Sequence, residues 1–213
     1  MFEHAPETTT SEPALLAPGD PPVFEVLNPD GAAPLLLICD HASQAVPHAL
    51  DNLGLDADAM NRHIAWDIGA AAVTRRLSQR LDAAAVLAGY SRLVIDLNRD
   101  PGDPGSIPEI SDNHPVPRNQ DLSPEQKTER VNTFFHPYHR TITEALTQPR
   151  HQKKPPVLLS IHTFTPSLGG EDRYWDIGVL WNRDPRLVQP LIDVLGTQGD
   201  LHVGDNVPYS GRE

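Results

Sequence analysis

Two histidines follow apolar runs that have the length of buried strands. His41 comes one residue after the run 34–39 (PLLLIC), and His162 comes directly after the run 156–161 (PVLLSI). Because the carboxyl ends of parallel strands meet at one edge of a sheet, the two imidazoles are expected to lie together there. Either histidine alone is more simply interpreted as a partner of local backbone groups, but the pair favours a shared metal ion.

A metal held by two histidines needs a further ligand from the protein. Catalytic zinc sites commonly use three ligands from histidine and carboxylate side chains and leave the fourth position to water. Asp67, expected on the helix that follows the first histidine, is the candidate carboxylate, and Asp40 is the alternative. The competing interpretation of Asp67 is an exposed helix carboxylate.

Two arginines flank a short apolar run in a protein that is otherwise anionic. Arg92 and Arg99 stand on either side of the run 93–95, which is expected to be a strand. Arginine binds carboxylates through two parallel hydrogen bonds, so the pair predicts an acidic substrate in a locally positive pocket. The competing interpretation is a surface ion pair with Asp96 or Asp100.

Apolar runs of strand length alternate with amphipathic segments of helix length along the chain. This alternation predicts an α/β fold, a three-layer α/β/α arrangement with a mixed, mainly parallel sheet. The runs predict strands at 34–39, 84–88, 93–95, 156–161 and 177–181, and helices at about 57–81, 124–146 and 184–195.

A polar, proline-rich passage separates the central strands from the second helix. Its prolines predict a loop without regular elements over residues 100–126, and long ordered loops are often functional. Ser123 and Pro124 are then expected to start the helix. On that helix, His136 and His139 are expected to be bystanders, as surface histidines of a helix usually are.

Composition excludes several classes of protein. The chain has 213 residues, with 17 Lys+Arg against 29 Asp+Glu and a net charge of −12, which disfavours nucleic-acid and membrane-surface partners. Its single cysteine, Cys39, excludes an internal disulfide and favours the cytoplasm, where it is expected to be a small buried hydrophobe. We expect an N-terminal arm over 1–20, without a signal peptide, and one domain over 21–213.

Six motifs follow one another along the chain. They are CDHAS (39–43), HIAWDIGA (63–70), YSRLVIDLNRDP (90–101), SIPEISD (106–112), SIHTF (160–164) and VPYSGRE (207–213). Together they resemble the N-formylglutamate amidohydrolase family, which is related to the zinc carboxypeptidases and to aspartoacylase. The resemblance covers about residues 34–213 and implies a zinc-exopeptidase-like α/β/α hydrolase. Such an enzyme removes the N-formyl or another N-acyl group from a small acidic amino acid such as N-formylglutamate.

The resemblance also implies roles for individual residues. It implies zinc ligation by two histidines and a carboxylate, and it implies three residues that bind the substrate or polarise the scissile carbonyl. The implied ligands are His41, Asp67 and His162, and the implied substrate-binding residues are Arg92, Asn98 and Arg99, of which Arg92 is also a candidate catalytic residue.

The sequence departs from the family's pattern in two places. Gln44 stands where carboxypeptidase-like relatives carry a glutamate ligand. The family normally continues beyond VPYSGRE into a helix and a strand that carries a glutamate general base, whereas this chain ends at Glu213. We therefore expect a domain truncated at its C-terminus, with a sheet that could lack one edge, and Glu109 or Glu213 as the candidate general base.

Other functions share these features. A metallo-carboxypeptidase or another N-acyl amino acid deacylase would keep the metal and change the substrate. A non-catalytic ligand-binding homologue would keep the pocket without the general base.

Overall fold

The computed structural model describes residues 15–148, 156–168 and 170–212. The chain divides into two compact units, residues 1–163 and 164–213. All of the candidate site residues that the structure describes belong to the first unit.

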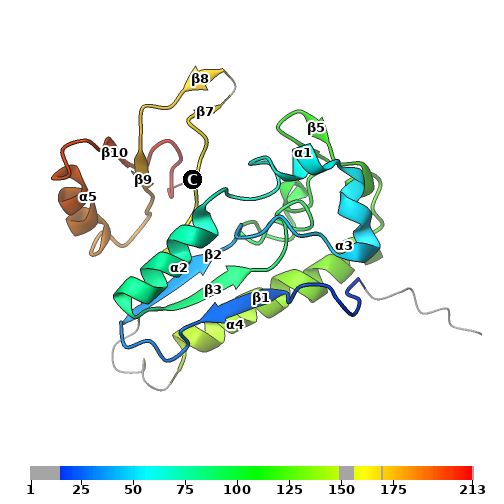
Figure 1. Ribbon diagram of the computed structural model, residues 1–213, viewed down its shortest axis with the longest axis horizontal. Helices are drawn as coiled ribbons and strands as arrows, with labels where there is room; N and C mark the ends of the chain where they lie inside the picture. Colours follow the sequence, from blue (N-terminus) through cyan, green and yellow to red (C-terminus); the bar gives the residue numbers. More distant parts are fainter. Residues whose placement is uncertain (1–14, 149–155, 169, 213) are drawn as a thin grey trace, which may run out of the picture. The chain divides into compact units, whose positions relative to one another are not determined.

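The first unit is built on a four-stranded sheet in the order β1-β3-β2-β6 (Figure 1). β2 pairs in parallel with both β3 and β6, whereas β1 pairs with β3 in the antiparallel sense. The predicted α/β fold with a mainly parallel sheet is therefore confirmed. The strands are β1 (Phe24–Leu27), β2 (Leu35–Cys39), β3 (Ala84–Ala88) and β6 (Val157–Ser160).

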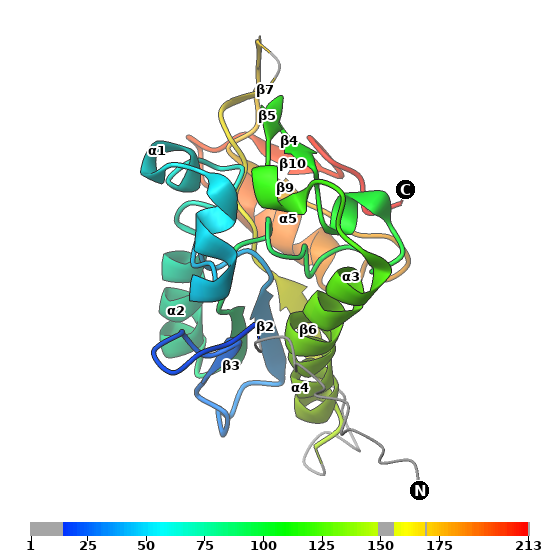
Figure 2. The ribbon, with the colours of Figure 1, turned by 90° about the vertical axis from the view of Figure 1, so that its right-hand side faces the viewer.

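Successive side chains of β2 face opposite sides of the sheet. Leu36 and Ile38 join the larger apolar cluster, which includes Tyr138 of helix α4 (His136–Leu146). Leu37 and Cys39 join a smaller cluster beneath helix α2 (Ala70–Leu81). Figure 2 shows α2 and α4 on opposite sides of β2 and β3, which gives the three layers that the sequence predicts.

The strand at β6 is less buried than its apolar sequence suggests. β6 is an edge strand in the part of the sheet that the structure describes, since it pairs only with β2 there. Val157 and Leu158 are 41% and 45% exposed. The interpretation of this run as a strand is confirmed, but its burial on both faces is wrong.

The helix predicted over 57–81 is interrupted. Helix α1 (Ala57–Met60) ends after one turn, and α2 begins only at Ala70, after Gly69 with φ +89°. Between them the backbone N–H of Asp67 donates to the carbonyl of His41, a contact that holds this turn against the end of β2. Asp67 thus lies in the turn before α2, and its predicted place on a helix is wrong.

The predicted strand at 93–95 is a buried turn. The Ser91 hydroxyl oxygen accepts the N–H of Leu93 at 3.1 Å, and the Ser91 carbonyl accepts the N–H of Val94 at 2.9 Å. These local bonds satisfy backbone groups that a strand would pair with a neighbour. The apolar run is still buried, since Leu93, Val94 and Ile95 are at most 2% exposed.

Residues 100–126 contain short elements where the sequence predicts none. They are the 3₁₀ turns η2 (Pro104–Ser106) and η3 (Pro117–Asn119) and the hairpin of β4 (Ile110–Ser111) with β5 (His114–Pro115). A further 3₁₀ segment, η1 (His48–Gly54), lies earlier in the chain. Buried polar groups order the loop: the Asn119 amide donates to the Leu93 and Pro108 carbonyls, and Arg130 donates to the Asn119 side chain at 2.7 Å.

The second long helix begins where the sequence predicts it. Ser123 and Gln126 form a capping box at the start of α3 (Pro124–Arg130). A π-helical turn, η4 (Val131–Phe135), joins α3 to α4, and the sequence pattern does not indicate it.

The helices that the structure describes are too short or too polar to span a membrane.

The second unit is small and has two separate strand pairs. β7 (Ser167–Leu168) pairs with β8 (Glu171–Asp172), and β9 (Ile177–Val179) pairs in parallel with β10 (Val203–Asp205), which the sequence analysis missed. Helix α5 (Val188–Gly196) begins four residues later than predicted.

The burial of Cys39 gives a testable expectation for its reactivity. Cys39 has no exposed surface, and its burial raises the pKa of the thiol to about 12. At about pH 8 only roughly one thiol in 10,000 would then be the reactive thiolate. Iodoacetamide should therefore leave the native protein unmodified and alkylate it once denatured, as intact-mass spectrometry would show. Rapid alkylation of the native protein would contradict this burial.

Candidate metal centre

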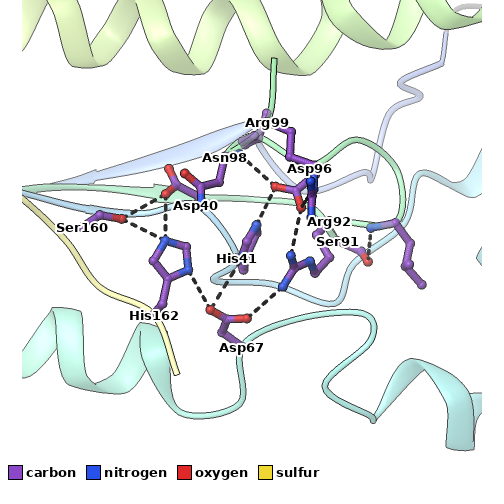
Figure 3. Close-up of polar contacts among 12 residues, drawn as sticks. Asp40, His41, Asp67, Ser91, Arg92, Asp96, Asn98, Arg99, Ser160 and His162 are labelled. Atoms are coloured by element: carbon purple, nitrogen blue, oxygen red, sulfur yellow. Dashed lines mark hydrogen bonds and ion pairs between the residues drawn. The ribbon is translucent and has the colours of Figure 1, made fainter. Parts of the chain in front are cut away.

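The two histidines lie side by side at one edge of the sheet (Figure 3). His41 follows β2 and His162 follows β6, and these strands are adjacent and parallel, with Ile38 opposite Ser160. The ring centroids are 4.9 Å apart. The pairing of two strands thus brings together two histidines that are more than one hundred residues apart in the chain.

Asp67 lies between the two imidazole rings. Its Oδ2 atom is 2.9 Å from Nδ1 of His162 and 3.4 Å from Nδ1 of His41. The same oxygen accepts the backbone N–H of Thr163 at 3.2 Å. One potential ligand atom from each of His41, Asp67 and His162 lies within 4.8 Å of the others, and we call these three residues the His–Asp–His cluster.

The outer nitrogen of each imidazole contacts a second carboxylate. Nε2 of His41 is 2.8 Å from Oδ1 of Asp96, and Nε2 of His162 is 3.2 Å from Oδ2 of Asp40. A carboxylate accepts hydrogen bonds, so each contact favours a proton on Nε2 and leaves the lone pair of a neutral ring on Nδ1. Nδ1 of each ring then faces Asp67, and a metal ion bound there would take the place of the proton that His162 donates from Nδ1 to Asp67.

These residues fit a metal ion. Nδ1 of His41 is buried and has no hydrogen-bond partner among the residues that the structure describes, a costly state that a metal ion would relieve. Ligand atoms around a tetrahedral zinc with bonds of about 2.0–2.1 Å are about 3.3 Å apart, close to the 2.9 Å and 3.4 Å found around Asp67 Oδ2. Two imidazoles and one carboxylate are a donor set that zinc accepts.

Asp40 and His41 have different partners although they are neighbours in the turn after β2. Asp40 accepts the hydroxyl of Tyr138 of α4, whereas His41 contacts Asp67 in the turn before α2. Of the two carboxylates that the sequence offers as the third ligand, Asp67 is therefore the one that faces both rings.

The cluster holds its carboxylates in the ionised form. Burial by itself would raise the pKa values of Asp67 and Asp96, but hydrogen bonds and the charge of neighbouring imidazoles outweigh burial and lower both. Asp40 is shifted in the same direction because of His162 and Tyr138. The site therefore carries three negative charges within a few ångströms.

His162 forms the open side of the cluster. Burial would lower the pKa of His162, but its bonds to Asp40 and Asp67 prevail and raise it to about 9. Its side chain is 32% exposed, whereas those of His41 and Asp67 are 2% and 6% exposed. His162 is therefore the most exposed of the three residues of the cluster.

Arg92 contacts both Asp67 of the His–Asp–His cluster and Asp96. Its Nη1 is 3.3 Å from Oδ1 of Asp67, and its Nη2 is 2.9 Å from Oδ2 of Asp96. The sequence analysis also offers a surface ion pair of an arginine with Asp96. The ion pair is present, but it is not at the surface, since Asp96 is only 3% exposed. The fixed guanidinium offsets part of the negative charge beside the cluster.

Arg99 is held more loosely than Arg92. Its Nε is 3.5 Å from Asp96, its Nη1 is 3.5 Å from Asp103, and its side chain is 49% exposed. The backbone N–H of Asn98 donates to Asp96 at 2.9 Å. Asp96 thus contacts both His41 of the His–Asp–His cluster and the segment that carries Asn98 and Arg99.

Glu109 lies apart from these contacts. Its side chain is exposed, and in the described parts of the chain no hydrogen bond or ion pair joins it to the His–Asp–His cluster. Its assignment as a catalytic residue stays a prediction: Glu109→Gln should lower kcat by roughly 100-fold or more if Glu109 is the general base. An unchanged kcat would remove it from the mechanism.

Glu213, the other candidate base, lies outside the described residues, and Gln44 is exposed and not part of the cluster.

Helix α4 supplies two contacts that sequence analysis missed. The Tyr138 hydroxyl donates to Oδ1 of Asp40 at 2.9 Å, and Nε2 of His139 lies 2.8 Å from the carbonyl of Leu97. His139 thus has a structural partner, and its expected role as a bystander to metal binding stays a prediction. An apolar helix face predicts that Tyr138 is buried, but it carries no signal for the partner of the hydroxyl.

Comparisons with known proteins point to one family. The family model for N-formylglutamate amidohydrolase matches residues 33–213. The crystal structure of a gene product from Agrobacterium tumefaciens is similar at 33% identity and a TM-score of 0.87, over 92% of this chain and 77% of that chain. The structure of N-formylglutamate amidohydrolase from Ralstonia eutropha JMP134 shares the fold at 21% identity and a TM-score of 0.66, over 89% and 77%. A comparison with curated proteins finds no match.

Proposed function

Because the chain belongs to the N-formylglutamate amidohydrolase family, we propose that it hydrolyses the N-formyl amide of a small acidic amino acid, giving formate and glutamate from N-formylglutamate. We propose further that the reaction depends on zinc bound by His41, Asp67 and His162. The observation that carries the metal proposal is the buried Nδ1 of His41, which faces Asp67 and has no hydrogen-bond partner within residues 15–148, 156–168 and 170–212.

Zinc, when bound, would polarise the formyl carbonyl and lower the pKa of a coordinated water from 15.7 toward about 7. The chain's own residues prepare the site for this. Asp96 and Asp40 favour a proton on each Nε2 atom, which directs both Nδ1 atoms to the metal, and metal binding would release the Nδ1 proton of His162.

The arginines take different roles in this proposal. Arg92 is oriented by Asp67 and Asp96 beside the cluster, where its positive charge would stabilise the negative charge that develops on the carbonyl oxygen. Arg99 is half exposed and loosely paired, so its guanidinium can turn to bind a substrate carboxylate. Asn98, adjacent to Arg99, would add hydrogen bonds to the same substrate.

The direct test is formate release from N-formyl-L-glutamate by purified protein, with and without zinc. We expect one zinc per chain, formate release that a chelator abolishes and zinc restores, and much slower hydrolysis of N-acetyl-L-glutamate and N-formyl-L-leucine. A rise in Tm with N-formylglutamate but no formate would instead support the ligand-binding homologue. Release of a C-terminal residue from acidic dipeptides would support the carboxypeptidase alternative.

The proposed setting is the cytoplasm. The single buried cysteine suits a reducing compartment, and the net charge of −12 disfavours nucleic acid and anionic membranes as partners. A small anionic substrate then depends on the local charges of Arg92 and Arg99.

A further inference from the structure

Asp40 is a buried carboxylate with both of its oxygens engaged. It follows β2 directly and is only 3% exposed. Oδ1 accepts the hydroxyl of Tyr138 at 2.9 Å. Oδ2 lies 3.0 Å from the hydroxyl of Ser160 and 3.2 Å from Nε2 of His162, and the Ser160 hydroxyl is itself 3.0 Å from that Nε2 (Figure 3). A group so placed has a fixed orientation relative to the imidazole.

Tyr138 provides the anchor for this orientation. It has no exposed surface, and it belongs to α4, which packs on the face of the sheet opposite α2. The packed ring keeps its hydroxyl at Oδ1 of Asp40, so that Oδ2 remains directed at His162. The core of the domain thus determines where the carboxylate points.

We propose that Asp40, anchored by Tyr138, is a positioning residue for His162, which it holds with a proton on Nε2 and with Nδ1 free for the metal. The inference rests on the proposed function and deepens it. A neutral imidazole carries one N–H, and a carboxylate acceptor at Nε2 keeps it there. The other nitrogen of His162, Nδ1, lies 2.9 Å from Oδ2 of Asp67, so metal binding at Nδ1 would replace the proton that this contact holds.

Asp40 differs from Asp96, which contacts His41 in the same way. Asp96 also pairs with Arg92 and Arg99, which share its negative charge. Among the described residues, Asp40 has no arginine or lysine partner and otherwise meets neutral hydroxyls. Its charge therefore acts mainly on His162 and also on the adjacent His41, and a charged acceptor makes an imidazole a more basic ligand.

Zinc affinity of the metal-free protein, measured by competition with a chromophoric chelator, tests the role without relying on turnover. Asp40→Asn keeps the size of the side chain, but its amide N–H can donate to Nε2 of His162 and place the proton on Nδ1. We expect the zinc Kd of Asp40→Asn to rise about 10- to 100-fold. Tyr138→Phe keeps the packed ring and loses only the anchor, with an expected rise of roughly 2- to 10-fold.

Two matched variants separate positioning from general destabilisation. Ile142 lies one turn beyond Tyr138 on the same buried face of α4, and Ile142→Val removes one buried methyl group while keeping Tyr138. Asp121→Asn removes an exposed carboxylate at a backbone φ of +53°, a conformation that asparagine tolerates. Both should bind zinc as the wild type does, even where Tm falls.

The outcomes are distinct. A wild-type zinc Kd in Asp40→Asn overturns the inference and leaves the proposed function intact, whereas absence of zinc binding by the wild type overturns both. A larger loss in Ser160→Ala than in Asp40→Asn would assign the role to the hydroxyl and also overturn it. If Asp40→Asn does not fold, Tyr138→Phe decides: weaker zinc binding than Ile142→Val supports the inference, and equal binding contradicts it.

Discussion

Replacing His41 or His162 by alanine is expected to abolish stoichiometric zinc binding and to lower kcat/KM by about 1,000-fold or more. Each variant removes one of three protein ligands and leaves two, too few for a stable catalytic zinc site. A bound metal contributes several kcal/mol to the transition state, and about 4 kcal/mol corresponds to three orders of magnitude. Metal analysis after dialysis and a formate-release assay would measure both effects.

His136→Ala is the matched control for these variants. His136 is exposed on α4, and its ring contacts Phe135 rather than the cluster. It should retain one zinc per chain and full activity. Stoichiometric zinc in the double variant of His41 and His162 would place the metal elsewhere in the protein and remove the basis of the proposed mechanism.

Arg99→Leu is expected to remove the preference for an acidic substrate. A charge-assisted hydrogen bond contributes about 1.5–3 kcal/mol, so the loss of one carboxylate contact should lower kcat/KM for N-formylglutamate by roughly 10- to 150-fold. Hydrolysis of the neutral analogue N-formyl-L-leucine should change little. Because Arg99 is half exposed and its two partners are 3.5 Å away, its removal should leave the fold stable.

Two further variants make the Arg99 experiment specific. Arg99→Lys keeps the charge but loses the planar fork, and we expect an intermediate kcat/KM. Arg118→Leu removes a surface arginine of similar exposure that pairs with Asp51, and it should leave both substrates unaffected. An unchanged ratio of the two substrates in Arg99→Leu would show that another group binds the substrate carboxylate.

Several elements follow from the sequence because their signals are local. Continuous apolar runs predict β2, β3 and β6, and the Ser123–Pro124 pair predicts the start of α3. The run 93–95 is misleading for a physical reason: its apolar side chains are buried, but the Ser91 hydroxyl and carbonyl compete for the backbone bonds of a strand. Apolar composition reports burial more reliably than it reports backbone conformation.

The sequence by itself determined the residue types of the site and the edge at which they meet. Histidines that end two parallel strands must share one edge, and here their rings are 4.9 Å apart. Only the tertiary structure decided which carboxylate faces the rings. Asp40 and His41 are neighbours in the turn after β2, and the segments packed on the two sides of the sheet determine what each side chain meets. Asp40 meets Tyr138 of α4, whereas His41 meets Asp67 in the turn before α2, because contacts between distant segments depend on packing that no local pattern encodes.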